Sequence, residues 1–241
     1  MASALRQPPD DTVDLWAALP GGVADAAEAV EQLAPDERTR AAQLSGQTAT
    51  AFVMARAFLR QVAGRYLQRP PADVAFVYGR YGRPDLRSDP DSPAPPSISL
   101  SHSRDLIVVA VAAAPVGVDT EARDRQGDDQ DLRRCLTPVE RFAIDAQPAS
   151  QRREALLIAW TRKEAVAKAM GLGLHLPFDG IGAGTTIDDR FLRLAPPGER
   201  AEEWTVLSEL LCGAIVSVAV RARAARTVWR NAPHAARCHA G

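Results

Sequence analysis

The chain has 241 residues, the size of one large domain or two small ones. Its 29 Lys and Arg residues against 30 Asp and Glu residues give a net charge of −1, which argues against a protein that coats nucleic acid. With 46% hydrophobic and 24% charged residues, the chain can form a globular core. Its longest apolar run, residues 106–116, is too short to span a bilayer.

The three cysteines are Cys135, Cys212 and Cys238, and they lie far apart in the sequence. They form neither a disulfide framework nor a zinc-binding spacing. We therefore expect a cytoplasmic protein, with neither a membrane nor a nucleic acid as partner.

The first half of the chain predicts a strand followed by helices. Residues 1–12 are polar and are expected to be loose. A strand is predicted over 13–19, helices over 25–33 and from Pro35 onward, and a long helix over 48–67, where apolar residues recur at helical spacing. A further strand over 74–78 runs into the turn signal GRYGRP.

The second half begins with three strand-like runs, SISLSHS, DLIVVAVAAA and VGVDTE, which predict a meander of adjacent antiparallel strands. Thr137 and Glu140 form a capping-box pattern at a helix start. A helix is predicted over 154–170 and ends at Gly171, and strands are predicted over 205–210 and 214–222. Because helices and strands alternate irregularly, the fold class is expected to be α+β.

Asp119 and Glu121 are two residues apart in a predicted strand, so their side chains face the same side. Two adjacent carboxylates repel unless a proton or a cation lies between them. Oxygen ligands of this kind suit Mg²⁺ better than zinc. The alternative is an exposed strand end with two solvated acids.

Glu164 precedes Lys168 by four residues, which places both on one helix face. Of the 29 basic residues only two are lysines, Lys163 and Lys168, and both lie in this segment. Glu164 is therefore a candidate third oxygen ligand and Lys168 a candidate phosphate contact, whereas the alternative is an ordinary surface pair.

His102 lies at a strand end between Ser101 and Ser103, where hydroxyls and an imidazole can bind phosphate oxygens. Ser101 and His102 are poorly placed as a nucleophile and its base, because adjacent residues in a strand point to opposite faces.

The motifs GRP, S-x-SHS, GVDTE and W-T-x-KE-x-x-x-K-x-x-G-x-G-L occur in this order. Over residues 35–176 the chain thereby resembles the Sfp-like 4′-phosphopantetheinyl transferases. The resemblance implies a monomer of two similar α/β subdomains packed as a pseudo-dimer, here residues 13–115 and 116–222. The last 21 residues carry five arginines and no acidic residue, and this composition predicts a loose basic tail over 223–241. Coenzyme A would bind in the cleft between the halves, together with Mg²⁺ or alternatively Mn²⁺.

The resemblance also implies roles for individual residues. Asp119, Glu121 and Glu164 would hold the metal, with Glu164 as the candidate general base and Lys168 as a phosphate contact that assists the leaving group. The residues expected to bind coenzyme A are Arg40, Arg56, Arg83, Ser101, His102 and Lys168. Ala51 departs from the family, in which an arginine is common at this position, and this weakens the expected 3′-phosphate pocket.

The function implied is transfer of 4′-phosphopantetheine from coenzyme A to a serine of an apo acyl, peptidyl or polyketide carrier protein, a holo-[acyl-carrier-protein] synthase type of activity that often serves secondary metabolism. One alternative is another Mg²⁺-dependent phosphoesterase. A second is an inactive coenzyme A-binding subunit, which would be expected to lack metal ligands.

Residues 133–142 interleave arginines with Leu136, Val139 and Phe142 at helical spacing. This pattern predicts a docking face for the carrier protein. The apolar residues could equally pack into the C-terminal half, and the sequence leaves the two interpretations open.

Overall fold

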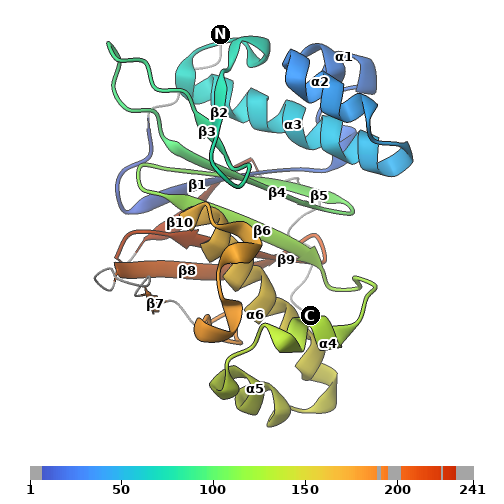
Figure 1. Cartoon of the computed structure of the whole chain (residues 1–241), viewed down its shortest axis with the longest axis vertical. Helices are drawn as coiled ribbons and strands as arrows, with labels where there is room; N and C mark the ends of the chain where they lie inside the picture. Colours follow the sequence, from blue (N-terminus) through green and yellow to red (C-terminus); the bar gives the residue numbers. More distant parts are fainter. Residues whose placement is uncertain (1–6, 189–190, 195–201, 224, 232–241) are drawn as a thin grey trace.

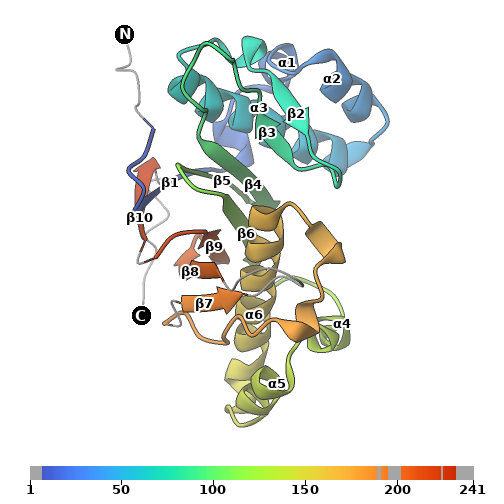
Figure 2. The same cartoon turned by 60° about the vertical axis from the view of Figure 1, so that its left-hand side comes forward.

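Two four-stranded sheets lie at the centre of the molecule, and each has a long helix on its outer face (Figure 1, Figure 2). The structure is a computed structural model that describes residues 7–188, 191–194, 202–223 and 225–231. These residues form a mixed α+β fold, as the irregular alternation of elements predicts. No described helix has the length and apolar character needed to cross a bilayer.

The first sheet has the strand order β10-β1-β5-β4 and is covered by helices α1 to α3. Strands β1, β5 and β4 are antiparallel neighbours, whereas β10 runs parallel to β1. The elements of this half, with a small hairpin β2-β3, are β1 (Thr12–Ala18), η1 (Pro20–Gly22), α1 (Ala26–Glu31), α2 (Pro35–Ala42), α3 (Gly46–Leu67), η2 (Pro71–Asp73), β2 (Phe76–Tyr78), β3 (Pro84–Leu86), β4 (Ser97–Ser103), β5 (Leu106–Ala112) and β10 (Arg226–Asn231).

The second sheet is antiparallel throughout, with the order β6-β9-β8-β7. Helix α6 packs along β6 and β9, and α4 and α5 project beyond the far end of the sheet (Figure 1). The elements are β6 (Val116–Ala122), α4 (Asp129–Arg134), α5 (Pro138–Asp145), α6 (Ala149–Met170), η3 (Gly173–His175), η4 (Phe178–Gly180), β7 (Phe191–Leu194), β8 (Glu202–Leu211) and β9 (Ala214–Val220).

The two sheets pack against each other through an apolar layer that explains the long hydrophobic run of β5. All seven residues of β5 are buried. Val109 and Val111 face α3, whereas Val108 and Ala110 face the second sheet and contact the layer that contains Val118. A strand covered on both faces needs a continuous apolar sequence, as β5 has.

Several predicted elements are confirmed with small changes of boundary. The long helix predicted over 48–67 begins at Gly46, and the helix predicted over 154–170 begins earlier, at Ala149. Gly171 ends α6 in the left-handed conformation, with φ of 69°. The capping box is formed as predicted, because the Thr137 hydroxyl accepts from the Glu140 N–H and the Glu140 carboxylate accepts from the Thr137 N–H.

Two predictions were wrong. The three-strand meander is interrupted, because β6 leaves β5 after Pro115 and joins the second sheet beside β9. Pro115 has no N–H for a ladder, and its carbonyl instead accepts from Arg221. The predicted loose tail contains a strand, since residues 226–231 form β10, which Arg230 ties to the buried Asp14 at 2.8 Å. Residues 232–241 lie outside the described residues.

Gly117 sets how closely α6 approaches β6. A Cβ atom placed at this position would lie 1.9 Å from the Ala165 carbonyl oxygen and 2.5 Å from the Ala169 nitrogen. Both atoms belong to the helix backbone, which cannot rotate away as a flexible side chain can. Only glycine therefore allows α6 to lie against the strand that carries Asp119 and Glu121.

We predict that Gly117→Ala lowers the free energy of unfolding by about 1–3 kcal/mol or more, because the added methyl group overpacks the contact between α6 and β6. Thermal or urea unfolding measures the change. Gly182→Ala is the matched control, because no atom lies within 4 Å of a Cβ added there. Equal stability of the two variants would contradict the close approach.

Candidate active site

Asp119 lies at the junction of three elements, on β6 with α6 beside it and β4 across from it. Its carboxylate is buried. The Oδ1 atom accepts hydrogen bonds from the Ser101 hydroxyl at 2.9 Å and from the Lys168 ammonium at 2.7 Å. The Oδ2 atom is buried and has no hydrogen-bond partner. One oxygen of this carboxylate is therefore fixed by the protein, and the other is left for a further ligand.

Glu121 and Glu164 lie near Asp119 and respond to its charge. The pKa of Glu164 is raised to about 7, mainly by burial and secondly by the negative charge of Asp119, while the Lys168 ammonium opposes this rise. Burial and Asp119 also raise the pKa of Glu121, opposed by Arg125 and by a hydrogen bond from Trp160. The structure thus brings the three predicted carboxylates close enough to repel one another.

Sequence reasoning missed the two residues that hold Glu121. The Arg125 guanidinium lies 3.6 Å from the Glu121 carboxylate, and the Trp160 indole is the hydrogen-bond partner. The signal for Trp160 was present in the W-T-x-KE motif. It precedes Glu164 by four residues, so the two side chains share one face of α6.

The carboxylates suit a hard divalent cation in their donor atoms. Three carboxylates without a cation or a shared proton repel, and the unpartnered Asp119 Oδ2 needs a positive partner. Among the described residues, no three Asp, Glu, His or Cys side chains lie close enough together to coordinate one metal ion as they stand. In this structure the Lys168 ammonium is the cation beside Asp119. The donor set fits Mg²⁺, with Lys168 as a second positive charge at its edge.

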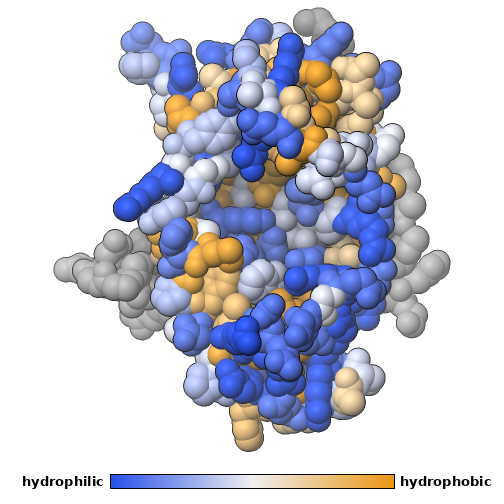
Figure 3. Space-filling model, turned by 45° about the vertical axis from the view of Figure 1, so that its right-hand side comes forward, coloured by the Kyte–Doolittle hydropathy of each residue, from blue (hydrophilic) through white to orange (hydrophobic). Residues whose placement is uncertain are grey.

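His102 lies at the end of β4, within electrostatic range of Lys168 and Asp119. Partial desolvation of its ring and the nearby Lys168 ammonium lower the pKa of His102. The residue also lines an open cavity of about 1870 Å³ between residues 17–23 and the start of α3, which neither Asp119 nor Glu164 lines. Figure 3 shows the surface hollowed between the two halves, with hydrophilic side chains in the hollow.

The predicted arginines occupy three different settings. Arg56 is buried and donates to Glu37 at 2.7 Å, and Arg60 donates to the same carboxylate at 2.5 Å. Arg83 donates to the Ala169 carbonyl oxygen and to Ser97, while Arg40 is exposed on α2. No hydrogen bond or ion pair among the described residues links Arg40, Arg56 or Arg83 to His102 or Lys168. Their contact with coenzyme A stays a prediction.

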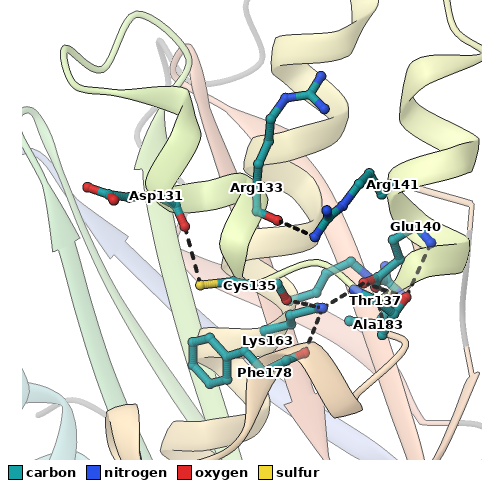
Figure 4. A network of polar contacts seen from close by, with 10 residues as sticks. Asp131, Arg133, Cys135, Thr137, Glu140, Arg141, Lys163, Phe178 and Ala183 are labelled. Carbon is teal, nitrogen blue, oxygen red and sulfur yellow. Dashed lines mark hydrogen bonds and ion pairs between the residues drawn. The ribbon is translucent and has the colours of Figure 1, made fainter.

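Lys163 is fully buried, and its side chain is directed toward Glu140, Cys135 and Phe178 (Figure 4). Its ammonium donates to the Glu140 carboxylate at 2.6 Å and to the carbonyl oxygens of Cys135 and Phe178 at 2.6 and 2.8 Å. Glu140 also accepts from the Ala183 N–H. Lys163 therefore joins α6 to the end of α4, to the first turn of α5 and to η4, and its role is structural.

The apolar residues of 133–142 divide between the two interpretations. Leu136 is buried, whereas Val139 and Phe142 are 77% and 79% exposed on α5. The rim arginines Arg133 and Arg134 are each paired with a neighbouring aspartate. The face is therefore apolar and solvent-exposed, and its use as a docking site stays a prediction.

Comparisons with known proteins all point to the same family. Residues 115–213 match the family described as the 4′-phosphopantetheinyl transferase superfamily. The chain is 31% identical over 121 residues to a 4′-phosphopantetheinyl transferase of Bacillus subtilis, which covers 50% of this chain and 52% of the relative. It is 31% identical over 125 residues to the 4′-phosphopantetheinyl transferase HetI of Nostoc sp., which covers 51% and 52%. It is 26% identical over 121 residues to the 4′-phosphopantetheinyl transferase Sfp of Bacillus subtilis, which covers 50% and 52%.

These matches confirm the resemblance that the motifs predicted: the chain is Sfp-like in sequence. The matches span about half the length of the curated relatives. The matched family region contains Asp119, Glu121, Glu164 and Lys168, which are the residues gathered at the junction of β6 and α6.

We predict that Lys163→Ala lowers the free energy of unfolding by about 3–5 kcal/mol, because it leaves the buried Glu140 carboxylate without its ion pair. Urea unfolding measures the loss. Arg134→Ala is the control, because its pair with Asp131 is exposed and such pairs contribute about 0–1 kcal/mol. A loss below about 1 kcal/mol for Lys163→Ala would contradict the buried network.

Proposed function

We propose that this protein transfers the 4′-phosphopantetheine group of coenzyme A to a serine of an apo carrier protein. The observation that carries the proposal is the gathering of Asp119, Glu121 and Glu164 beside Lys168, from two elements that the sequence separates by about 40 residues. Relatives that match this region are named as 4′-phosphopantetheinyl transferases, which supports the same reaction here.

In the proposed reaction the serine oxygen of the carrier forms a bond to the β-phosphorus of coenzyme A. The bond from this phosphorus to the bridging oxygen breaks, and 3′,5′-ADP leaves with the electron pair. Negative charge grows on the bridging and equatorial oxygens, so positive charge placed there lowers the barrier. The reaction needs no covalent enzyme intermediate, in agreement with the poor placement of Ser101 and His102 as a nucleophile pair.

Each residue of the site has a proposed task. Asp119, Glu121 and Glu164 would hold Mg²⁺, which supplies positive charge at the pyrophosphate when it is bound. Lys168 stabilises the leaving phosphate, and Glu164 is the candidate acceptor of the serine proton, which then passes to solvent. His102 and the arginines Arg40, Arg56 and Arg83 are proposed to bind the nucleotide end of coenzyme A.

Further features of the proposal concern the molecule as a whole. Each half contains a four-stranded sheet and one 22-residue helix, which supports a pseudo-dimer of two similar subdomains within a monomer. The exposed Val139 and Phe142 on α5 are the proposed docking face for the carrier. A holo-[acyl-carrier-protein] synthase type of specificity and a cytoplasmic location remain predictions from the sequence.

The two alternatives account for less. A Mg²⁺-dependent phosphoesterase would use the same acids, but the relatives that match are named as transferases. An inactive coenzyme A-binding subunit would be expected to lose a metal ligand, whereas all three carboxylates are present.

We predict that Asp119→Asn and Glu164→Gln each reduce transfer by at least about a hundredfold, because each removes one charge from a three-carboxylate metal site. Intact mass of an apo carrier, incubated with coenzyme A and Mg²⁺, measures the product. Asp131→Asn is the control, because its carboxylate is 77% exposed and pairs with Arg134. Rates within about threefold of wild type for both site variants would contradict the metal assignment.

We predict that Lys168→Ala strongly reduces kcat and that Lys168→Arg restores only part of it. The planar guanidinium is larger than an ammonium and cannot occupy the same point between Ser101 and Asp119. Steady-state kinetics with saturating coenzyme A measures the effect. Full activity of Lys168→Arg would show that the position requires positive charge alone.

A further inference from the structure

The two sheets meet along a line of serine hydroxyls. β4 is the edge strand of the first sheet and β6 is the edge strand of the second. Every second residue of β4 is a serine, and the first three of these four serines each accept a hydrogen bond on Oγ from a backbone N–H of β6. The pairs, each separated by 19 residues, are Ser97 with Val116 at 3.2 Å, Ser99 with Val118 at 3.1 Å and Ser101 with Thr120 at 3.2 Å. We call these three pairs the serine seam.

The serine seam explains why the sequence reads S-I-S-L-S. The N–H groups of Val116, Val118 and Thr120 point away from β9 at the strand edge that no other strand pairs with. These residues are buried, and buried N–H groups need partners. The serine hydroxyls provide them, while the intervening Ile98 packs into the core beneath α3. Each of the three hydroxyls therefore adds one hydrogen bond between the two sheets.

Ser101 differs from Ser99 in what else it contacts. The Ser99 hydroxyl accepts from the Val118 N–H. The Ser101 hydroxyl accepts from the Thr120 N–H and, at 3.0 Å, from the Lys168 ammonium, and it donates to Asp119 Oδ1 at 2.9 Å. A serine hydroxyl has one hydrogen and two lone pairs, so these contacts use its full capacity.

We propose that Ser101 is a positioning residue that orients the Asp119 carboxylate and the Lys168 ammonium relative to each other. It is 6% exposed, and its three internal bonds leave no donor or acceptor for a phosphate of coenzyme A. The seam fixes Ser101 to the backbone of β6, so the second sheet and the first sheet together set the direction of Asp119 Oδ2. The inference rests on the proposed function in taking Asp119 as a metal ligand.

The test compares Ser101→Ala with Ser99→Ala in the full chain, using Mn²⁺ titration followed by electron paramagnetic resonance. Both variants lose one bond of the serine seam, so both should lower the melting temperature by a similar amount. Ser101→Ala should weaken Mn²⁺ binding by about tenfold or more, the usual effect of removing a partner that orients a metal ligand. Ser99→Ala should stay within about threefold of wild type.

A second readout is independent of metal and of activity. Because the chain has two lysines, ¹⁵N-lysine labelling gives two side-chain signals, with Lys163 as an internal reference. Ser101→Ala should shift or broaden the Lys168 signal and leave the Lys163 signal in place, whereas Ser99→Ala should leave both. Ser101→Thr keeps a hydroxyl and should give the wild-type Mn²⁺ affinity and Lys168 signal. If Ser101→Ala does not fold, Ser101→Thr is measured in its place.

The outcomes separate the two proposals. If Ser101→Ala binds Mn²⁺ as wild type does and leaves the Lys168 signal unchanged, while its affinity for coenzyme A falls, Ser101 is a ligand contact and the inference is overturned. If Ser101→Ala shows the expected losses but the wild-type chain does not modify apo carrier proteins, the positioning role stands and the proposed function fails. If wild type binds no Mn²⁺, the metal assignment fails and the Lys168 signal decides the positioning role.

Discussion

The arrangement of the site depends on one buried carboxylate. Asp119 is held from two sides, by a hydroxyl on β4 and by an ammonium on α6. Its position therefore depends on how the two sheets are placed relative to each other. A buried carboxylate with one unpartnered oxygen is costly unless a positive charge completes it. Folding therefore creates a site at Asp119 that favours a cation, and the nearby Glu121 and Glu164 carboxylates add negative charge to it.

Buried ion pairs fix each long helix to its surroundings at some distance from this carboxylate. Glu37 on α2 holds Arg56 and Arg60 of α3, and Glu140 on α5 holds Lys163 of α6. Removing one partner of such a pair leaves an uncompensated buried charge, so both helices resist displacement. Lys168 and Glu164 then reach the site from a helix whose depth is set by Gly117 and whose rotation is set by Lys163.

Local signals in the sequence were sufficient for most elements and for bringing Asp119, Glu121, Glu164 and Lys168 close together. The helical spacing of Glu164 and Lys168, the period-two spacing of Asp119 and Glu121, and the capping box at Thr137 each depend on a few adjacent residues, and each appears in the structure. The function of Lys163 could not be predicted in this way, because Glu140 and the Phe178 carbonyl come from distant segments. The burial of Arg56 against Glu37 is of the same kind.

The serines and the final strand show a different limit. The alternation S-I-S-L-S predicted a strand, but not that its polar face would meet another sheet edge, because the partner N–H groups carry no sequence signal. The arginines of β10 suggested a loose segment, although the strand also contains Thr227 and Trp229. The side chains of Thr227 and Trp229 donate hydrogen bonds to Glu209 on β8, and Arg230 pairs with Asp14 on β1. Charge alone suggested a loose tail, whereas the strand is stabilised by partners that only the fold brings together.

Strand β10 adds a further link between the two halves of the molecule. The chain leaves the second sheet after β9 and returns to the first sheet, where β10 pairs with β1. The halves are therefore linked by the β5–β6 connection, by the serine seam and by this returning strand, in addition to the apolar layer between the sheets. Separation of the halves would break the serine seam, the contacts of the returning strand and the apolar layer together. Rigid joining of this kind suits a site built from both halves, because a carboxylate on one sheet can keep its orientation only if the hydroxyl on the other sheet does not move.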